Sequence, residues 1–523
     1  MNEVLHADDV ASRSAQGARS WAARNGVVAG AILAVLIGLI VHVSPWLAAG
    51  LGDSHDGYNA AMWGLGARGA VEDPIGNRLG GIHPDGFEYA NHPPLLVWSL
   101  IPVTAVADGS ALGLRLVPLL ASIAAIGMLA ALLIDAAFSR FATAGGILLA
   151  GSTAMFLSFG AMVDTPVLGL PFALGAIWVG QRSWQGRPPP TWLAVAAAAL
   201  AAIAGWQAFL AAALAAVFAA VIGRKSQVER RAAGALACGA AGGLAVDLVW
   251  TWWVYGGLTE LLDQGISRSE MDTGSWFSQQ VENATNLFGP FTIAILLGGA
   301  IILIVRPQLV SDATNSDKTE DDHGQLADGS GANRSARPLF LLMTLVVIGY
   351  ALLFRHGAWA HSYWNYYGIA LIGVATAVLL QVADRSTRSF SPVARMLVLA
   401  LVTASTIVVA VVSWGTRSLA DFGIRTGLEV VPLIEELPAV RDPRSIGVAT
   451  LGGDPVKPWL RWTTGGQSLA VERSEVAELD PDQLVLVTLP LAAPRSTWAG
   501  TSATSNGHYA LIPAGELEKI LNP

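Results

Sequence analysis

The sequence is poor in charge and in cysteine. Aspartate, glutamate, lysine and arginine make up only 13% of its 523 residues, whereas hydrophobic residues make up 53%. Soluble domains carry about 25% charged residues, so this balance argues against a soluble protein and predicts a polytopic membrane protein. The single cysteine, Cys238, excludes an intrachain disulfide and a cysteine metal cluster.

Long apolar runs are plentiful. Residues 27–43 are long enough to cross a hydrocarbon core of about 30 Å and too long for the apolar core of a signal peptide, so we expect an uncleaved first span. A signal-peptide cleavage site at residues 46–50 is the alternative. The segments 191–204 and 205–222 could be two helices or one bent helix. Eleven segments are apolar enough to be helices: 27–49, 114–136, 141–160, 164–181, 191–204, 205–222, 232–256, 286–306, 338–354, 362–382 and 394–414.

The segment 93–107 is apolar but short. It has about fifteen residues and begins with two prolines, so we expect a re-entrant or interfacial helix there and no span. With the N-terminus in the cytoplasm, the inner segments then hold 17 lysines and arginines and the outer loops 5. Cytoplasmic segments are enriched in these residues, so the positive-inside rule supports this topology.

This topology predicts the domain organisation of an all-α polytopic membrane protein. Residues 1–26 are a cytoplasmic tail, and residues 27–415 form the transmembrane domain. The first outer loop covers residues 50–112 and contains the short apolar helix. Residues 311–337 are polar and rich in Asp, Ser and Gly, which predicts a disordered linker on the inner side.

The C-terminal segment, residues 416–523, is predicted to lie outside. Strand-like runs at 445–452 and 483–490 alternate there with polar turns, which predicts a small extracytoplasmic α/β domain. Its nine basic and thirteen acidic residues create no strong field, so a nucleic acid is not an expected partner.

Polar residues of five separate segments meet at the outer boundary of this topology. Ionisable groups at a membrane boundary cost several kcal/mol unless they pair or face a cavity, so their gathering on one side predicts a functional cavity open to the outside. A transporter more often places its charges near the bilayer midplane. The five segments are GDSHDGYN (52–59), EYANHPPLL (88–96), MVDTP (162–166), GISRSEMD (265–272) and RHGAWAHSYWNYY (355–367).

Each of these segments also has a purely structural interpretation. The acidic residues after the first span could begin a solvated loop. Asp164, which precedes Thr165-Pro166, could be the N-cap of the next helix. His92-Pro93-Pro94 could be a helix start, Arg268 could be an ordinary loop arginine, and the aromatic run at 363–367 could be an interfacial belt. The coincidence of all five on one side favours a site.

Taken together, the motifs resemble the GT-C class of membrane glycosyltransferases, and within it the protein O-mannosyltransferases and lipid A aminoarabinose transferases. The resemblance covers residues 27–380 and leaves the C-terminal segment outside. The family's adjacent Asp-Glu pair is His55-Asp56 in this chain. The matching motifs, in order, are HDGYNAAMWGLGARG (55–69), YANHPPLLVW (89–98), GLRLVPLLAS (113–122), MVDTP (162–166) and HSYWNYYGIAL (361–371).

The resemblance implies transfer of a sugar from a polyprenyl-phosphate donor to an acceptor hydroxyl of a protein, a lipid or a cell-wall glycan. Inversion at the anomeric carbon and a decaprenyl or undecaprenyl carrier in a bacterial cytoplasmic membrane are expected. A carboxylate must take the acceptor proton, and a cation must hold the departing phosphate. Asp56 is the implied base and Asp53 its rival, whereas Asp164 would shape the acceptor side.

The remaining polar residues are assigned to substrate binding. Arg268 is the implied phosphate ligand, because a guanidinium matches phosphate geometry, and Arg355 and His356 are second choices. His92 would lie near the donor phosphate or a divalent metal ion. His55 and His92 are a weak pair of metal ligands, since no spacing supports them. Further residues expected to line the sugar and prenyl groove are Tyr58, Asn59, His361, Tyr363 and Tyr366.

Two other functional classes stay open. A lipid or sugar transporter or flippase would need coupling charges at mid-bilayer, and residues 191–222 are almost entirely alanine, leucine and isoleucine. A non-catalytic scaffold whose outer domain binds a wall component would leave the HD, HPPL and D-T-P motifs unexplained. Loss of Asp56 would have no effect in a scaffold.

Overall fold

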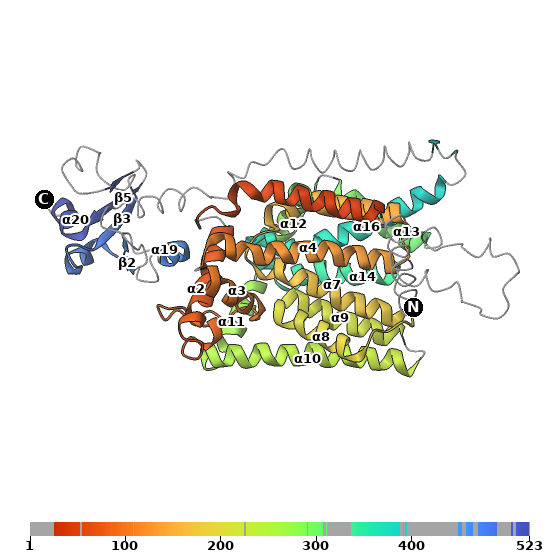
Figure 1. The fold of residues 1–523 in the computed structure, drawn as a ribbon, viewed down its shortest axis with the longest axis horizontal. Helices are drawn as coiled ribbons and strands as arrows, with labels where there is room; N and C mark the ends of the chain where they lie inside the picture. Colours follow the sequence, from red (N-terminus) through yellow and green to blue (C-terminus); the bar gives the residue numbers. More distant parts are fainter. Residues whose placement is uncertain are drawn as a thin grey trace, which may run out of the picture.

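The computed structural model describes residues 26–52, 55–107, 109–223, 226–289, 291–306, 310, 336–387, 391, 393–394, 448–451, 457–463, 469–488, 504–505 and 509–521. Four predictions fall outside these residues, namely the cytoplasmic tail apart from Gly26, the role of Asp53, the linker apart from its last two residues, and the apolar segment 394–414 apart from its first residue. The described part is a helical bundle with a small sheet beside one end of it (Figure 1).

Helices dominate the described residues, and five of them are long and apolar enough to cross a membrane. A sixth span results if the bent pair α12 and α13 counts as one. The membrane class is therefore confirmed, and the count of eleven stays a prediction. The five are the first helix Gly26–Leu47, α4 (Ala111–Asp135), α10 (Gln227–Tyr255), α14 (Ala336–Leu353) and η4 with α16 (Ser362–Asn365 and Gly368–Ser386).

Shorter helices fill the bundle between these spans. Thr153 separates α5 from α6, and its hydroxyl accepts from the Phe156 amide as the N-cap of α6. Close packing of α5 on α16 needs small residues, because a Cβ at Gly146 would lie 2.5 Å from the Gly373 carbonyl oxygen. The shorter helices are α5 (Arg140–Ser152), α6 (Ala154–Phe159), α8 (Thr191–Ala204), α9 (Trp206–Ile222), α12 (Thr273–Phe288) and α13 (Thr292–Val305), and α7 (Thr165–Trp184), with 20 residues, lies among them.

Helices α8 and α9 are an antiparallel pair, which settles the choice between two helices and one bent helix. Gly239 and Gly243 of α10 face Val195 and Ala199 of α8, so these two helices run in the same direction. The short turn after Ile222 sends α10 back along α9. The break between α8 and α9, at Gly205, lies beside Thr165 at the start of α7.

The predicted span 286–306 is shorter in the structure. Its helical part, α13, begins at Thr292, and α12 meets it at an angle of 98°. The apolar residues Leu287 and Phe288 end α12, and Phe291 precedes α13, so apolarity alone placed the boundary too early.

The short elements gather at one end of the bundle, here called the site end. Helix α3 has only 13 residues and packs on α2, as the re-entrant or interfacial interpretation of 93–107 requires. Figure 1 shows α2, α3 and α11 together at this end, on the side nearest the sheet. The elements are α2 (His55–Glu72), η1 (Arg78–Gly80), α3 (Leu95–Ala107), α11 (Thr259–Ser269), α15 (Arg355–Ala360) and η4.

The C-terminal segment contains the predicted α/β fold. Five strands pair in the order β2-β1-β3-β5-β4, with β1 parallel to β2 and β3 and with β5 antiparallel to β3 and β4. Ala449, Val485 and Ile512 lie opposite one another on neighbouring strands and belong to a small hydrophobic core. The elements are β1 (Val448–Leu451), α19 (Pro458–Thr463), β2 (Leu469–Val471), η7 (Arg473–Glu478), β3 (Leu484–Thr488), β4 (Thr504–Ser505), β5 (Tyr509–Pro513) and α20 (Ala514–Leu521).

Candidate active site

Asp56, which is half-buried, forms an ion pair with the buried Arg115 at the site end. Nε and Nη2 of Arg115 lie 2.8 and 2.7 Å from Oδ2 of Asp56. The Nη1 group of Arg115 donates to the carbonyl oxygens of Trp46, Leu47 and Ala49, at 3.0, 3.1 and 2.6 Å. These carbonyls end the first helix and the turn after it, where backbone acceptors lack helical partners. One guanidinium therefore fixes both the first helix and the first turn of α2.

The other carboxylate oxygen of Asp56, Oδ1, does not accept a hydrogen bond from Arg115. Oδ1 is buried and has no hydrogen-bond partner among the residues that the structure describes. The first turn of α2 packs tightly on the preceding segment, because a Cβ at Gly57 would lie 2.3 Å from the backbone nitrogen of Gly52. Glycine at position 57 thus permits a contact that holds Asp56 close to the end of the first helix.

Asp164 is the N-cap of α7 and also faces the site. Its Oδ1 accepts from the Thr165 amide at 2.6 Å, and its Oδ2 accepts from Nδ2 of Asn59 at 2.5 Å. Asn59 also donates to the Tyr363 hydroxyl, at 3.3 Å. Burial raises the pKa of Asp164 to about 6, although its hydrogen bonds and the charge of Arg268 oppose the shift. The structural and the functional interpretation of Asp164 are therefore compatible.

Arg268 reaches the site from the last turn of α11. Its Nη1 donates to Nε2 of His92 at 3.1 Å, and its Cζ lies 5.3 Å from the centre of the Trp364 ring. Burial, followed by the charges of Arg268 and His361, holds the pKa of His92 well below its usual value, so its imidazole is neutral and accepts this hydrogen bond. Within the described ranges no carboxylate lies within ion-pair distance of Arg268.

Aromatic and imidazole rings connect these polar groups. The ring of His55 lies 5.6 Å from Tyr363 and 6.4 Å from His361, and His361 lies 5.6 Å from Trp364. Burial, and then the charge of Arg268, lowers the pKa of His361 to about 4. Near neutral pH His92 and His361 are therefore uncharged, and Arg268 is the cation beside them.

The structure brings together most of the residues that the sequence suggested. Tyr58 lies near Tyr89, which is itself 6.3 Å from His92. Tyr366 is different, since it is fully buried in the bundle, where its hydroxyl lies 2.8 Å from that of Ser122. Tyr366 therefore lies apart from the other predicted groove residues, and its place in the groove stays a prediction. The residues brought together are Asp56, Asp164, His55, Tyr58, Asn59, His92, Arg268, His361 and Tyr363.

The second-choice phosphate ligands lie elsewhere. The nearest side-chain partner of Arg355 is Thr273 Oγ1, at 3.4 Å, and His356 Nδ1 lies 3.2 Å from the Ser267 carbonyl oxygen. Both contacts are exposed. Helix α15 thus places these two side chains against Ser267 of α11 and Thr273, the first residue of α12.

The described residues do not fit a divalent metal ion. No group of three or more His, Cys, Asp and Glu side chains among them could hold one. Arg115 occupies Oδ2 of Asp56, and both oxygens of Asp164 accept hydrogen bonds. Structural and catalytic zinc sites need at least three protein ligands, so the weak pair His55 and His92 gains no support.

Two residues of the site were missed in the sequence. Arg115 is part of the GLRLVPLLAS motif, and it is the only charged residue in α4 before Asp135. An isolated arginine in an apolar helix is itself a signal of function, because its burial is costly without a partner. Trp364 was grouped with an interfacial belt, and its contacts with Arg268, His92 and His361 show that it lies among the residues of the candidate site.

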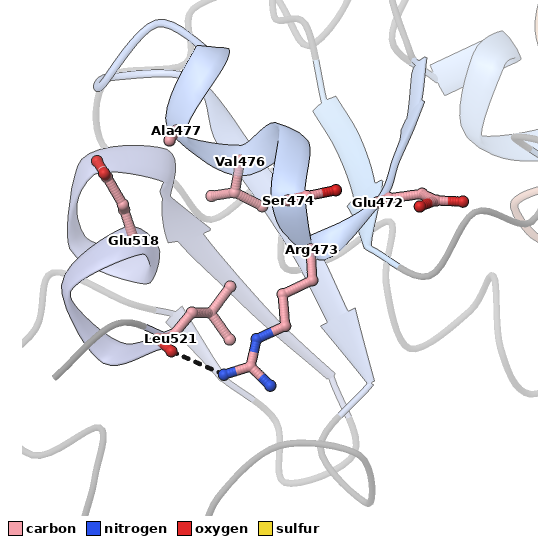
Figure 2. Close-up of a pocket in the computed structure, with 7 residues that line it drawn as sticks. All are labelled: Glu472, Arg473, Ser474, Val476, Ala477, Glu518 and Leu521. Carbon is pink, nitrogen blue, oxygen red and sulfur yellow. Dashed lines mark hydrogen bonds between the residues drawn. The ribbon is translucent and has the colours of Figure 1, made fainter.

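A separate hollow of about 390 Å³ lies in the C-terminal domain, between η7 and α20. Figure 2 shows that the guanidinium of Arg473 turns toward the end of α20, where it donates to the Leu521 carbonyl oxygen at 2.7 Å. Glu472 is engaged in the capping box of η7. Both charged groups thus stabilise the local fold, and the group at the site end is the stronger candidate.

Comparison with solved structures identifies the fold. ArnT from Cupriavidus metallidurans in the apo state superimposes with a TM-score of 0.57 at 13% identity, over 96% of this chain and 100% of ArnT. The same protein bound to undecaprenyl phosphate gives 0.54 at 13% identity, over 94% and 98%. An Archaeoglobus fulgidus oligosaccharyltransferase tethered with an acceptor peptide gives 0.51 at 13% identity, over 86% of this chain and 64% of its own.

Sequence comparison alone finds no relative. No protein-family model matches the chain, and no curated protein matches it. The structural matches nevertheless extend over most of this chain and over the whole of ArnT, with the C-terminal domain included. The chain has the fold of the GT-C membrane glycosyltransferases.

Proposed function

We propose that this protein is a glycosyltransferase that moves a sugar from a polyprenyl-phosphate donor to an acceptor hydroxyl. One observation carries the proposal, namely a single guanidinium, that of Arg268, facing a buried site without a carboxylate partner among the described residues. A cation in such a site calls for an anionic ligand, and a guanidinium suits a phosphate. The fold supports this, since ArnT has been solved with undecaprenyl phosphate bound.

In the proposed reaction the acceptor oxygen attacks the anomeric carbon while the bond from that carbon to the phosphate oxygen breaks. Oδ1 of Asp56 takes the acceptor proton, because Oδ2 is held by Arg115. The departing phosphate carries the electron pair of the broken bond and is stabilised by Arg268. A single displacement of this kind inverts the configuration at the anomeric carbon.

The remaining residues have positioning roles in this proposal. Neutral His92 accepts from Arg268 and fixes the direction of the guanidinium without competing for the phosphate. Asp164 holds Asn59, and Asn59 links it to Tyr363. Both oxygens of Asp164 are occupied, so it is a weaker candidate for the base than Asp56, which has a free oxygen.

We further propose that the protein is a multi-pass protein of the cytoplasmic membrane, with the site end and the C-terminal domain (416–523) outside. The asymmetry of lysine and arginine between the two sets of loops supports this orientation. A donor in the outer leaflet and an external acceptor would then both reach the site end.

The test is transfer in membranes that contain the protein, with a panel of radiolabelled polyprenyl-phosphate sugars. Label should move from one donor into a glycolipid or a non-extractable product. No transfer from any donor, with the protein shown to be folded, would contradict the proposal and favour transport or a scaffold. The donor that succeeds identifies the sugar, and the labelled product identifies the acceptor.

An apolar cavity of about 460 Å³ next to the site is suited to the prenyl chain. It lies between α12, α13, α14 and α16, and its lining includes Phe288, Leu296 and Val347. Asn365, from the same η4 turn as Tyr363 and Trp364, also lines it. The cavity therefore adjoins the site that would hold the phosphate.

Filling this cavity should weaken binding of long-chain donors. Ala284 lines it, and we expect Ala284→Trp to raise KM for a C55 donor roughly tenfold, which corresponds to lost burial of about two CH2 groups. A donor with a two-isoprene chain should be unaffected. Ala213→Trp, in the hollow between α9 and α10, is the matched control. An equal effect on both chain lengths would rule out the cavity as the prenyl site.

The raised pKa of Asp164 predicts a dependence of stability on pH. The folded state holds the proton up to about pH 6, whereas the unfolded chain releases it near 3.8. The stabilisation from this proton is complete below about 3.8 and is lost as pH rises to about 6. Asp164→Asn keeps an N-cap acceptor and cannot ionise. Between pH 4 and 7 the Tm of the wild type should therefore fall relative to that of Asp164→Asn, and parallel curves would contradict the assignment.

A further inference from the structure

A short helix of the C-terminal domain inserts into the first loop of the transmembrane domain. Trp459, Leu460 and Trp462 of α19 are buried, with exposed fractions of 2%, 0% and 8%, in one cluster with residues of α2 and α3. This contact is therefore part of the folded core, unlike a loose contact between neighbouring domains.

The ring of Trp462 fills a space beside Gly64 of α2 and Gly109, here called the socket. A Cβ at Gly64 would lie 2.8 Å from the Trp462 ring, and one at Gly109 would lie 2.6 Å from it. The guanidinium of Arg68 stacks on the ring at 3.8 Å, and its Nη1 donates to the Trp462 carbonyl oxygen at 3.0 Å. Gly64 and Arg68 of α2, whose first turn carries Asp56, and Gly109 between α3 and α4 are thus arranged around a single tryptophan.

Arg461 makes a second contact, with the loop at residues 81–92. Its Nε donates to Oδ2 of Asp85 at 2.5 Å, and its Nη2 lies 3.4 Å from Nδ1 of His83. Its Cζ lies 5.0 Å from the centre of the Phe87 ring. Burial, and then the charge of Arg461, lowers the pKa of His83 to about 3, so His83 is neutral and can accept from the arginine.

The same loop continues directly into the site. The ring of Phe87 stacks on Tyr89 at 6.5 Å, and Tyr89 lies 6.3 Å from His92, the acceptor of Arg268. Trp63, next to Gly64 on α2, lies 5.9 Å from His92. Contacts between adjacent residues thus lead from Arg461 and Trp462 to His92, although α19 itself contributes no group to the site.

We propose that α19 is a positioning element for catalysis, with Arg461 and Trp462 as positioning residues that seat the loop at 81–92 and α2. This inference rests on the proposed function and deepens it. The C-terminal domain thereby controls turnover by setting the geometry of His92, Arg268 and Asp56. Misplacement of catalytic groups by about 1 Å can cost roughly a hundredfold in rate.

The test uses Arg461→Gln in the full-length protein, with two readouts. Hydrogen–deuterium exchange should rise in residues 81–92 and at the start of α2. The kcat for transfer should fall by roughly ten- to a hundredfold with little change in donor KM. The matched control is Arg473→Gln in the same domain. Among the described residues this arginine donates to the Leu521 carbonyl oxygen, away from α2 and the loop at 81–92, so both readouts should stay at wild-type values.

A charge exchange separates positioning from simple loss of stability. The double variant Arg461→Asp with Asp85→Arg restores the ion pair in reverse and should recover part of both readouts. Unchanged exchange in residues 81–92 would overturn the inference, as would raised exchange with unchanged kcat. If the wild type transfers no sugar, the proposed function fails and the exchange measurement alone decides whether α19 seats the loop.

Discussion

Replacing Asp56 with asparagine is expected to lower kcat for sugar transfer by about 10²- to 10⁴-fold, the usual contribution of a general base. An asparagine side chain can still accept from Arg115 through its carbonyl oxygen, so the contact that holds the first helix to α2 is conserved in kind. The loss should therefore appear in kcat more than in donor KM. The measurement is steady-state transfer by the purified variant, with its Tm recorded alongside.

Asp263→Asn is the matched control for this experiment. Asp263 is an exposed carboxylate of α11, the helix that ends with Arg268, and its replacement should leave kcat unchanged. A well-folded Asp56→Asn variant with full activity would remove Asp56 from the base role. Attention would then turn to Asp53, which lies outside the described residues, and to Asp164.

Arg268→Gln is expected to have the second large effect. Removing a preorganised group that stabilises developing charge typically costs 10²- to 10³-fold. Because the guanidinium binds the phosphate both before and during transfer, donor KM should rise and kcat should fall. Arg268→Lys should recover only part of the activity, since an ammonium keeps the charge but loses the planar pair of donors and the contact with Trp364.

Arg355→Gln serves as the comparison, because the sequence offered Arg355 as an alternative ligand. Its contact in the structure is an exposed one with Thr273. We therefore expect donor KM and kcat each to change by less than about threefold, the limit for a residue outside the site. Equal losses in the two variants would mean that both arginines reach the donor, which contradicts the arrangement around His92.

Local patterns were sufficient to find most of the site. Asp56, His92 and Asp164 each lie next to a helix start, and their positions follow from the topology once the basic residues orient the loops. The alternation of apolar residues likewise predicted strands at 445–452 and 483–490, where β1 and β3 are found. Such signals lie within a few residues of the element that they predict.

Contacts between distant segments could not be found in this way. The pairing of Asp56 with Arg115 joins residues 59 positions apart, and nothing near either residue indicates the other. Tyr366 and Tyr363 belong to one aromatic run, yet the turn of η4 sends one into the core and the other into the site. Which face of a short turn points inward depends on the packing of its neighbours, which periodicity does not encode.

The separation between α19 and its socket has a consequence for biosynthesis. Arg68 and Trp462 are 394 positions apart, so at about 5–20 residues per second the ribosome needs roughly 20–80 s to reach the tryptophan after it has made the arginine. During that interval the spans enter the membrane while the socket on α2 is empty. A nascent or truncated chain that ends before Pro458 can insert its helices and yet lacks the segment that completes the first loop. Completion of the candidate site therefore has to wait until the segment 458–463 has been made.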